Sequence, residues 1–200
     1  LRPFNYKTGP VNGLFNPYSG IIQRVGSASL RIYLYHIPPV AQVGLSLALI
    51  ERLIKAYPGV IAGIKDSSGN WENTRALLEN FQSEDFDVFC GSEVFLLQTL
   101  RGGGGGCITA TGNVNPAAIV DLYRNWQEPD ADARQAAITA TRKTFEMLPM
   151  IASMKACIAW KRDVPQWGAV RPLLVAADAA QAARLREALD ALGFSMPVFL

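Results

Sequence analysis

The sequence has few of the residues that build metal centres or disulfide frameworks. Its 200 residues include one histidine, His36, and three widely spaced cysteines, Cys90, Cys107 and Cys157. The absence of any Cys-x-x-Cys pair argues against a zinc site or a disulfide framework, and the single histidine argues against a His-rich metal site. Cys90 and Cys107 lie in apolar, strand-like runs, which predicts reduced, buried thiols in a cytoplasmic protein.

Long apolar segments and runs of like charge are also missing. No stretch approaches the roughly 18 apolar residues of a membrane span, and the first residues of the sequence do not have the pattern expected of a signal peptide. The 19 basic and 17 acidic side chains are scattered and give a formal net charge of +2. The sequence therefore predicts neither a membrane partner nor a nucleic-acid partner. Half of the residues are hydrophobic, which is enough for a sizeable core.

Short apolar runs alternate with segments of helical periodicity in the first half of the chain. Strands are predicted to start near residues 30, 60, 86 and 106, the last covering 106–110, with a helix between each pair. Such βα repeats form a parallel sheet, either open and doubly wound or closed into a (β/α) barrel. Only helices are predicted later in the chain. We therefore divide it into 1–115, which holds the strands, and 116–200, a helical layer.

Local signals predict several element boundaries. Gly9 and Pro10 predict a loop over 7–12, followed by a helix over 13–25 with Pro17 in its first turn. Ser46 is predicted to cap the next helix.

The segment Val60–Gly69 holds the first candidate for chemistry. It is an apolar run with β-branched residues, followed by Lys65 and a polar turn, as in a buried parallel strand that ends at the lysine. Active sites of α/β barrels lie at the carboxyl ends of their strands, and desolvation there favours the neutral amine that attacks carbonyl groups. Lys65 is therefore a candidate Schiff-base nucleophile. The structural alternative is a lysine that extends past the strand end to solvent.

Tyr35 ends the preceding predicted strand. Neighbouring strands lie about 4.8 Å apart, so its phenol can share a pocket with Lys65 and shuttle protons during carbonyl chemistry. The alternative is an aromatic side chain that only packs at a strand end. His36 is either a base or a loop residue bonded to the backbone.

Two more features lie next to the predicted strands, one directly after the strand that follows the lysine strand and the other directly before the last strand. Gly91–Glu93 follows the strand after the lysine strand, which places Glu93 at the same edge as Lys65, where it can bind substrate hydroxyls. The alternative is that Ser92 caps the next helix and Glu93 lies in its first turn. The five glycines at 102–106 can bring backbone amides to an anionic group or form a flexible turn. They lack the Gly-Lys-Ser/Thr ending of a P-loop, so nucleotide binding has little support.

These motifs together resemble the dihydrodipicolinate synthase/N-acetylneuraminate lyase family of class I aldolases. The matching segments, in order, are Tyr33–Pro38, Gly63–Gly69 and the Gly-rich run 103–113 followed by Pro116. The resemblance implies the (β/α)8 TIM barrel of the α/β class, here about strands 5 to 8 plus a C-terminal helical extension. It also implies that no metal and no organic cofactor is needed.

The resemblance further implies a lyase that forms an imine with pyruvate or another 2-oxo acid and releases an aldehyde or water. The catalytic residues it implies are Lys65, the imine-forming amine, and Tyr35, the proton relay. The substrate-binding residues are Ile108, Gly91, Glu93 and His36. A homodimer or homotetramer is expected.

Three departures limit the resemblance. The family's N-terminal half has no counterpart, and Leu1–Tyr6 looks like the end of the fourth strand. Val40 stands where dihydrodipicolinate synthases carry an arginine, and Asn5 stands where a second tyrosine of the proton relay is usual. These changes argue against dihydrodipicolinate synthesis and favour another 2-oxo acid, such as a 2-keto-3-deoxy sugar acid. They also leave open a non-catalytic barrel fragment or a relative that only binds a keto acid.

Overall fold

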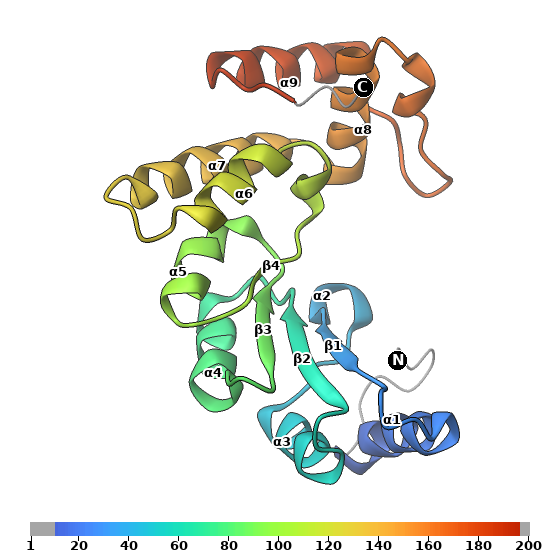
Figure 1. Ribbon diagram of the computed structural model, residues 1–200. Helices are drawn as coiled ribbons and strands as arrows, with labels where there is room; N and C mark the ends of the chain where they lie inside the picture. Colours follow the sequence, from blue (N-terminus) through green and yellow to red (C-terminus); the bar gives the residue numbers. More distant parts are fainter. Residues whose placement is uncertain (1–10, 197–200) are drawn as a thin grey trace. The chain divides into compact units, whose positions relative to one another are not determined.

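The computed structural model describes residues 11–196, and their contacts divide the chain into two units, 1–108 and 109–200. The described strands belong to the first unit, and the second is helical (Figure 1). The division after Ile108 falls inside the range 1–115 that the sequence assigned to the strand-bearing part. The expected strand end at Leu1–Tyr6 lies outside the described residues.

A parallel sheet forms the centre of the first unit. Its strands are β1 (Ile32–His36), β2 (Ile61–Asp66), β3 (Asp87–Cys90) and β4 (Gly106–Cys107), in the order β1-β2-β3-β4 (Figure 1). Every pairing among them is parallel, which confirms the predicted βα units. The carboxyl ends of these strands therefore meet at one edge of the sheet.

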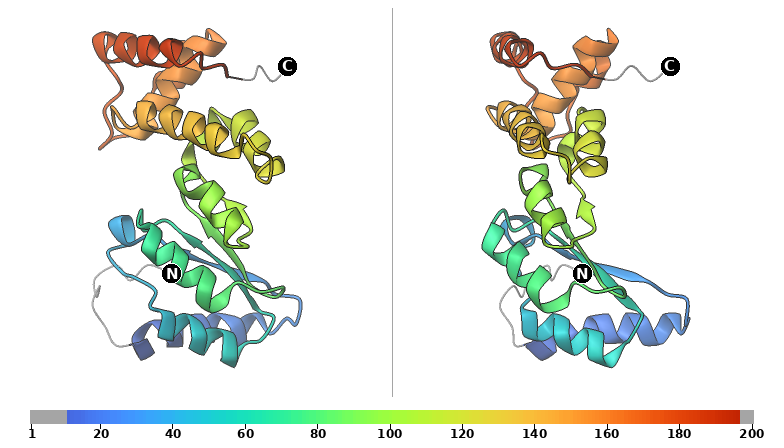
Figure 2. Two further views of the ribbon diagram at one scale, coloured as in Figure 1. Left: turned by 90° about the vertical axis from the view of Figure 1, so that its left-hand side faces the viewer. Right: turned by 60° about the vertical axis from the view of Figure 1, so that its left-hand side comes forward.

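Helices precede or connect these strands. They are α1 (Val11–Val25), α2 (Pro38–Ala41), α3 (Leu47–Ala56), α4 (Trp71–Phe81) and α5 (Leu96–Arg101), and Figure 2 shows α1 and α3 side by side. Ser46 caps α3 as predicted, because its side chain accepts a hydrogen bond from the Leu49 amide at 3.3 Å. The short α2 was not predicted; its two prolines occupy the first turn, where a missing N–H costs nothing.

The prediction for α1 was wrong at its start. The helix begins at Val11, inside the predicted loop, so Pro17 lies in its second turn and not in its first. Proline has no N–H for the carbonyl of Gly13, but Gly13 and Pro17 both lie on the exposed side of the helix. A water molecule can donate a hydrogen bond to the Gly13 carbonyl in place of the missing N–H, and the helix continues through the proline.

Helices cover one face of the sheet. Leu34, Ile64 and Val88 come from successive strands and are at most 2% exposed on this face. Leucine and isoleucine side chains of the helices complete the core, among them Leu49, Ile50, Leu53 and Leu77. The opposite face is open within the described residues, and β1 and β3 alternate between buried and more accessible positions.

The glycine run before β4 is a closely packed turn. A Cβ on Gly104 would lie 2.6 Å from the Thr99 methyl, and one on Gly105 would lie 3.0 Å from the Phe89 ring. The glycines are therefore needed where the turn approaches side chains of α5 and β3. The predicted strand 106–110 was too long, since the 3₁₀ helix η2 (Ala110–Asn113) follows almost directly.

The second unit contains helices and no strand within the described residues, as predicted. Its α-helices are α6 (Pro116–Arg124), α7 (Ala131–Phe145), α8 (Met150–Arg162) and α9 (Ala179–Ala191), with the 3₁₀ helix η3 (Pro165–Gly168). Phe145, Cys157 and Leu189 are fully buried in its core. No helix between residues 11 and 196 is long and apolar enough to cross a membrane.

Candidate active site

Lys65 and Tyr35 lie beside each other at the carboxyl ends of β2 and β1. They are Cα partners in the parallel pairing, so both side chains project to the open face of the sheet. The Lys65 Nζ donates a hydrogen bond to the Tyr35 hydroxyl at 3.2 Å and lies 4.3 Å from the centre of its ring. An amine that can attack a carbonyl group and a phenol that can transfer protons are thus in direct contact.

A second polar contact lies two residues earlier on the same face. The Tyr33 hydroxyl donates to the Asp87 carboxylate at 3.0 Å, which raises the pKa of Tyr33. The Tyr33 ring crosses over Gly63 to reach β3, and a Cβ on Gly63 would lie 2.5 Å from the Asp87 carbonyl oxygen. The sequence interpretation missed this pair, although Tyr33 and Tyr35 are spaced to share a face.

Asp66, next to Lys65, is buried and organises the turn after β2. Its carboxylate accepts hydrogen bonds from the Ser68 amide at 3.0 Å and from the Thr74 hydroxyl at 2.6 Å. Asp66 is only 3% exposed. This carboxylate therefore ties the strand that carries Lys65 to the first turn of α4.

Gly91 follows β3 and touches the turn after β2. Its amide donates to the Asp66 carbonyl at 2.6 Å. A Cβ at this position would lie 2.7 Å from that carbonyl oxygen and 2.8 Å from the Ser67 Cα. The absence of a side chain lets the two strand ends approach each other, which by itself explains a glycine here.

His36 projects to the helix-covered face, opposite to Tyr35. Its Nδ1 accepts a hydrogen bond from the Leu45 amide at 2.9 Å, and the side chain is 6% exposed. Burial lowers the pKa of His36, and the nearby Asp66 carboxylate opposes that shift in part. The neutral imidazole is thus bonded to the backbone, one of the two alternatives left open by the sequence.

Glu93 and Ile108 flank the same edge of the sheet. Glu93 is fully buried in the 3₁₀ helix η1 (Glu93–Phe95), which Ser92 caps through its contact with the Val94 amide. This is the capping arrangement that the sequence left open beside substrate binding. Ile108 is 47% exposed, and its amide donates to the Cys90 carbonyl at 2.9 Å. The site thus brings Lys65 and Tyr35 into contact and does not bring Glu93 to the open face.

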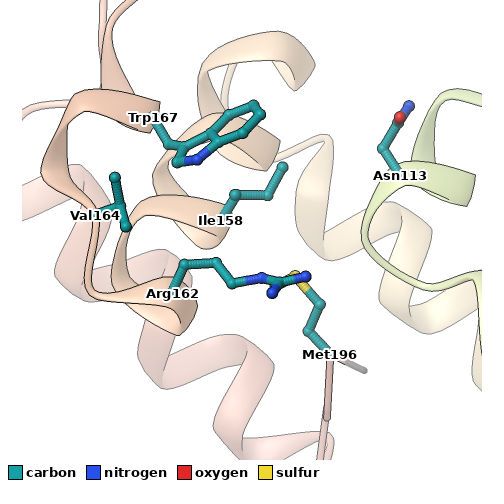
Figure 3. A pocket seen from close by; sticks show the side chains of 6 residues that line it. All are labelled: Asn113, Ile158, Arg162, Val164, Trp167 and Met196. Carbon is teal, nitrogen blue, oxygen red and sulfur yellow. The ribbon is translucent and has the colours of Figure 1, made fainter. Parts of the chain in front are cut away.

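A cavity of about 560 Å³ lies in the second unit, away from these residues in the chain. Figure 3 shows Trp167 and Val164 across it from Asn113. Its full lining is Asn113, Ile158, Arg162, Val164, Trp167 and Met196. The lining offers a cation and an amide but no nucleophile or base, so it is not a candidate for catalysis. Among the described residues, no three His, Cys, Asp or Glu side chains gather to hold a metal ion.

Lysine and tyrosine at the carboxyl edge of a parallel sheet define an α/β protein with a site suited to carbonyl chemistry. A model of the dihydrodipicolinate synthetase family matches residues 1–191, so the chain belongs to this family. Lyases and aldolases are among the family's members. The fold is that of the family's TIM barrels, present here as a parallel α/β part with a helical tail.

Individual relatives agree with this assignment. The chain is 30% identical over 177 residues to an uncharacterized DapA-like lyase of Chloroflexus aurantiacus. The aligned residues cover 87% of this chain and 58% of the relative. It is 31% identical over 157 residues to a probable 2-dehydro-3-deoxy-D-pentonate aldolase of Escherichia coli, with 78% and 49% covered. The crystal structure of dihydrodipicolinate synthase from Agrobacterium tumefaciens matches with a TM-score of 0.80 and 30% identity, over 95% of this chain and 63% of that one. The chain thus spans about half to three fifths of these relatives' lengths.

Proposed function

We propose that this protein is a class I lyase that cleaves a 2-oxo acid through an imine on Lys65. The observation that carries the proposal is the 3.2 Å contact between the Lys65 amine and the Tyr35 hydroxyl at the strand ends. The family's aldolases form a Schiff base on a lysine and use no cofactor, so the chemistry needs no group beyond the protein and its substrate.

The proposed reaction begins when the neutral Lys65 amine attacks the keto carbon. The resulting carbinolamine loses water to give an iminium ion, which draws electrons from the bond to be broken. Tyr35, in contact with the amine, hands over the protons that carbinolamine formation and dehydration require. Tyr35 then takes the proton from the hydroxyl group beside the bond to be broken, and cleavage of the carbon–carbon bond releases an aldehyde and leaves an enamine. Protonation and hydrolysis of the enamine give the shorter keto acid and free the Lys65 amine.

A 2-keto-3-deoxy sugar acid is the substrate class that we favour. The E. coli relative at 31% identity carries the name of an aldolase for such an acid. Val40, in α2, stands at the position of the carboxylate-binding arginine of dihydrodipicolinate synthases and offers no charge to a second carboxylate. Gly91 and Ile108 remain proposed neighbours of the substrate, whereas His36 and Glu93 are buried away from the open face. Assembly into a dimer or tetramer also remains a proposal.

Release of pyruvate from such an acid tests the proposal. We expect the purified protein to produce pyruvate from a five-carbon or a six-carbon 2-keto-3-deoxy acid, measured with lactate dehydrogenase and NADH. Lys65→Arg keeps the charge but removes the nucleophile, so turnover should fall to background. The control, Lys55→Arg, changes a surface lysine that pairs with Glu51 and should leave turnover unchanged. No pyruvate from either acid, or equal rates for both variants, would refute the proposed lyase.

A second candidate function is binding of a keto acid without turnover. The openness of the sheet face favours it, since Tyr35 is 50% exposed and Ile108 is 47% exposed within the described part of the chain. A site that excludes water favours imine formation and stabilises the charge that develops in the transition state, so an open site favours binding over turnover. An imine on Lys65 that forms without any pyruvate release would favour this candidate over the lyase.

A further inference from the structure

Two thiols lie opposite each other on neighbouring strands of the sheet. Cys90 ends β3 and Cys107 ends β4, and their Cα atoms are partners in the parallel pairing. Neighbouring strands are about 4.8 Å apart. A disulfide spans Cα separations of about 4.4 to 6.8 Å, so the backbone already has a spacing that the bond accepts.

The two sulfur atoms point toward each other. Directly paired residues project to the same face, and for this pair it is the helix-covered face, where Cys90 is fully buried. The Cys90 Sγ lies 3.6 Å from the carbonyl oxygen of Gly106, which shows that it reaches across to β4. A hydrogen bond between the thiols raises the pKa of Cys107 and lowers that of Cys90, which favours a reactive thiolate at Cys90.

A small oxidant can reach this pair. Cys107 is partly exposed. β4 has only two residues, lies at the end of the described sheet and follows the glycine run. A strand of two residues is held by few backbone hydrogen bonds and opens locally at low free-energy cost. The third cysteine, Cys157, is fully buried in α8, and burial raises its pKa to about 12.

We propose that Cys90 and Cys107 are a redox modification site that forms a reversible disulfide with hydrogen peroxide. The thiolate of one cysteine attacks a peroxide oxygen, the O–O bond breaks, and a sulfenic acid and one water form. The second sulfur attacks the sulfenic sulfur, the S–S bond forms, and a second water leaves. Two electrons pass from the two thiols to the peroxide. A dithiol reductant returns both cysteines to thiols by exchange.

The disulfide joins the strands directly before Gly91 and Ile108. Oxidation therefore fixes the spacing of β3 and β4 at residues that we propose to lie near the substrate. This consequence rests on the proposed function, whereas formation of the disulfide does not.

Peptide mapping tests the modification without any activity measurement. The protein is treated with hydrogen peroxide, quenched, alkylated under denaturing conditions and digested with trypsin. Cleavage after Arg101 separates the two cysteines, so we expect peptides 76–101 and 102–124 to appear cross-linked, about 2 Da lighter than the sum of the free peptides. Peptide 156–161, with Cys157, should appear alkylated in full, and dithiothreitol should release the cross-link.

Single-cysteine variants supply the controls. Cys107→Ser and Cys90→Ser should each abolish the cross-link, whereas Cys157→Ser should retain it. Cys90 and Cys107 that both stay alkylatable after peroxide treatment would overturn the proposal. A cross-link that involves Cys157, or oxygen addition to one cysteine without a cross-link, would overturn it too. Mapping of the wild-type protein decides these outcomes even where a variant fails to fold.

Discussion

Gly91→Ala should destabilise the first unit at the point where two strand ends meet. The added methyl group would lie 2.7 Å from the Asp66 carbonyl oxygen and 2.8 Å from the Ser67 Cα. Both are backbone atoms, so no side-chain rotation removes the overlap and the turn after β2 has to move. The hydrogen bond from the Gly91 amide to the Asp66 carbonyl, 2.6 Å long, would be distorted by that movement.

The expected loss of stability follows from the measured cost of overpacking in other proteins. An extra methyl group in a closely packed site costs about 1–3 kcal/mol. Loss of part of one backbone hydrogen bond adds up to about 1 kcal/mol. We therefore expect Gly91→Ala to lower the free energy of unfolding by about 1–4 kcal/mol, measured by urea unfolding followed by circular dichroism.

A second glycine of the same unit provides a matched control. A Cβ on Gly44 would lie 3.5 Å from the His36 Cε1, an ordinary van der Waals contact. Gly44→Ala should therefore change stability by no more than about 0.5 kcal/mol. Equal urea midpoints for the wild type and the two variants would refute the argument that close approach of the strand ends requires Gly91.

Three further predictions concern the site and its supports. Tyr35→Phe should slow turnover by about 10²- to 10⁴-fold, because the proton relay is removed; an unchanged rate would exclude Tyr35 from the mechanism. Thr74→Val removes the buried hydrogen bond to the Asp66 carboxylate and should lower the free energy of unfolding in urea by about 1.5–3 kcal/mol. Thr74→Ser keeps the hydroxyl and should retain most of the stability. Equal losses of stability in the two variants would contradict the role of the hydroxyl. Burial lowers the pKa of His36, so below about pH 6.5 the unfolded chain takes up a proton that the folded chain does not. The free energy of unfolding should therefore fall as the pH drops below about 6.5, by at most about 1.4 kcal/mol per pH unit. His36→Gln should lack this slope between pH 5 and 7, and a slope that persists in this variant would assign it to another group.

The contact between Lys65 and Tyr35 could be predicted from the sequence. Each residue follows a largely apolar run that is long enough for one strand, and parallel neighbours place their carboxyl ends together. The direction of His36 could also have been predicted. Adjacent strand residues project to opposite faces, so His36 and Tyr35 cannot both face the open side of the sheet.

Other features depend on approaches between distant segments. The need for glycine at 104 and 105 comes from the Thr99 methyl and the Phe89 ring, and the need for Gly91 comes from the turn at Asp66. Local sequence carries no information on such distances, so the glycine run looks like a flexible turn until its neighbours are known. The opposition of the two strand-end thiols likewise depends on the register between β3 and β4.

The most direct test of the proposed function is covalent trapping of the imine. The protein is incubated with pyruvate and borohydride, and intact mass is measured for the wild type, Lys65→Ala and the surface control Lys55→Ala. Reduction of one imine should add about 72 Da to the wild type and to Lys55→Ala, and nothing to Lys65→Ala. Trypsin does not cleave after the modified lysine, so the adduct should lie on peptide 56–75. A folded wild-type protein without an adduct, or an adduct that persists in Lys65→Ala, would contradict the account.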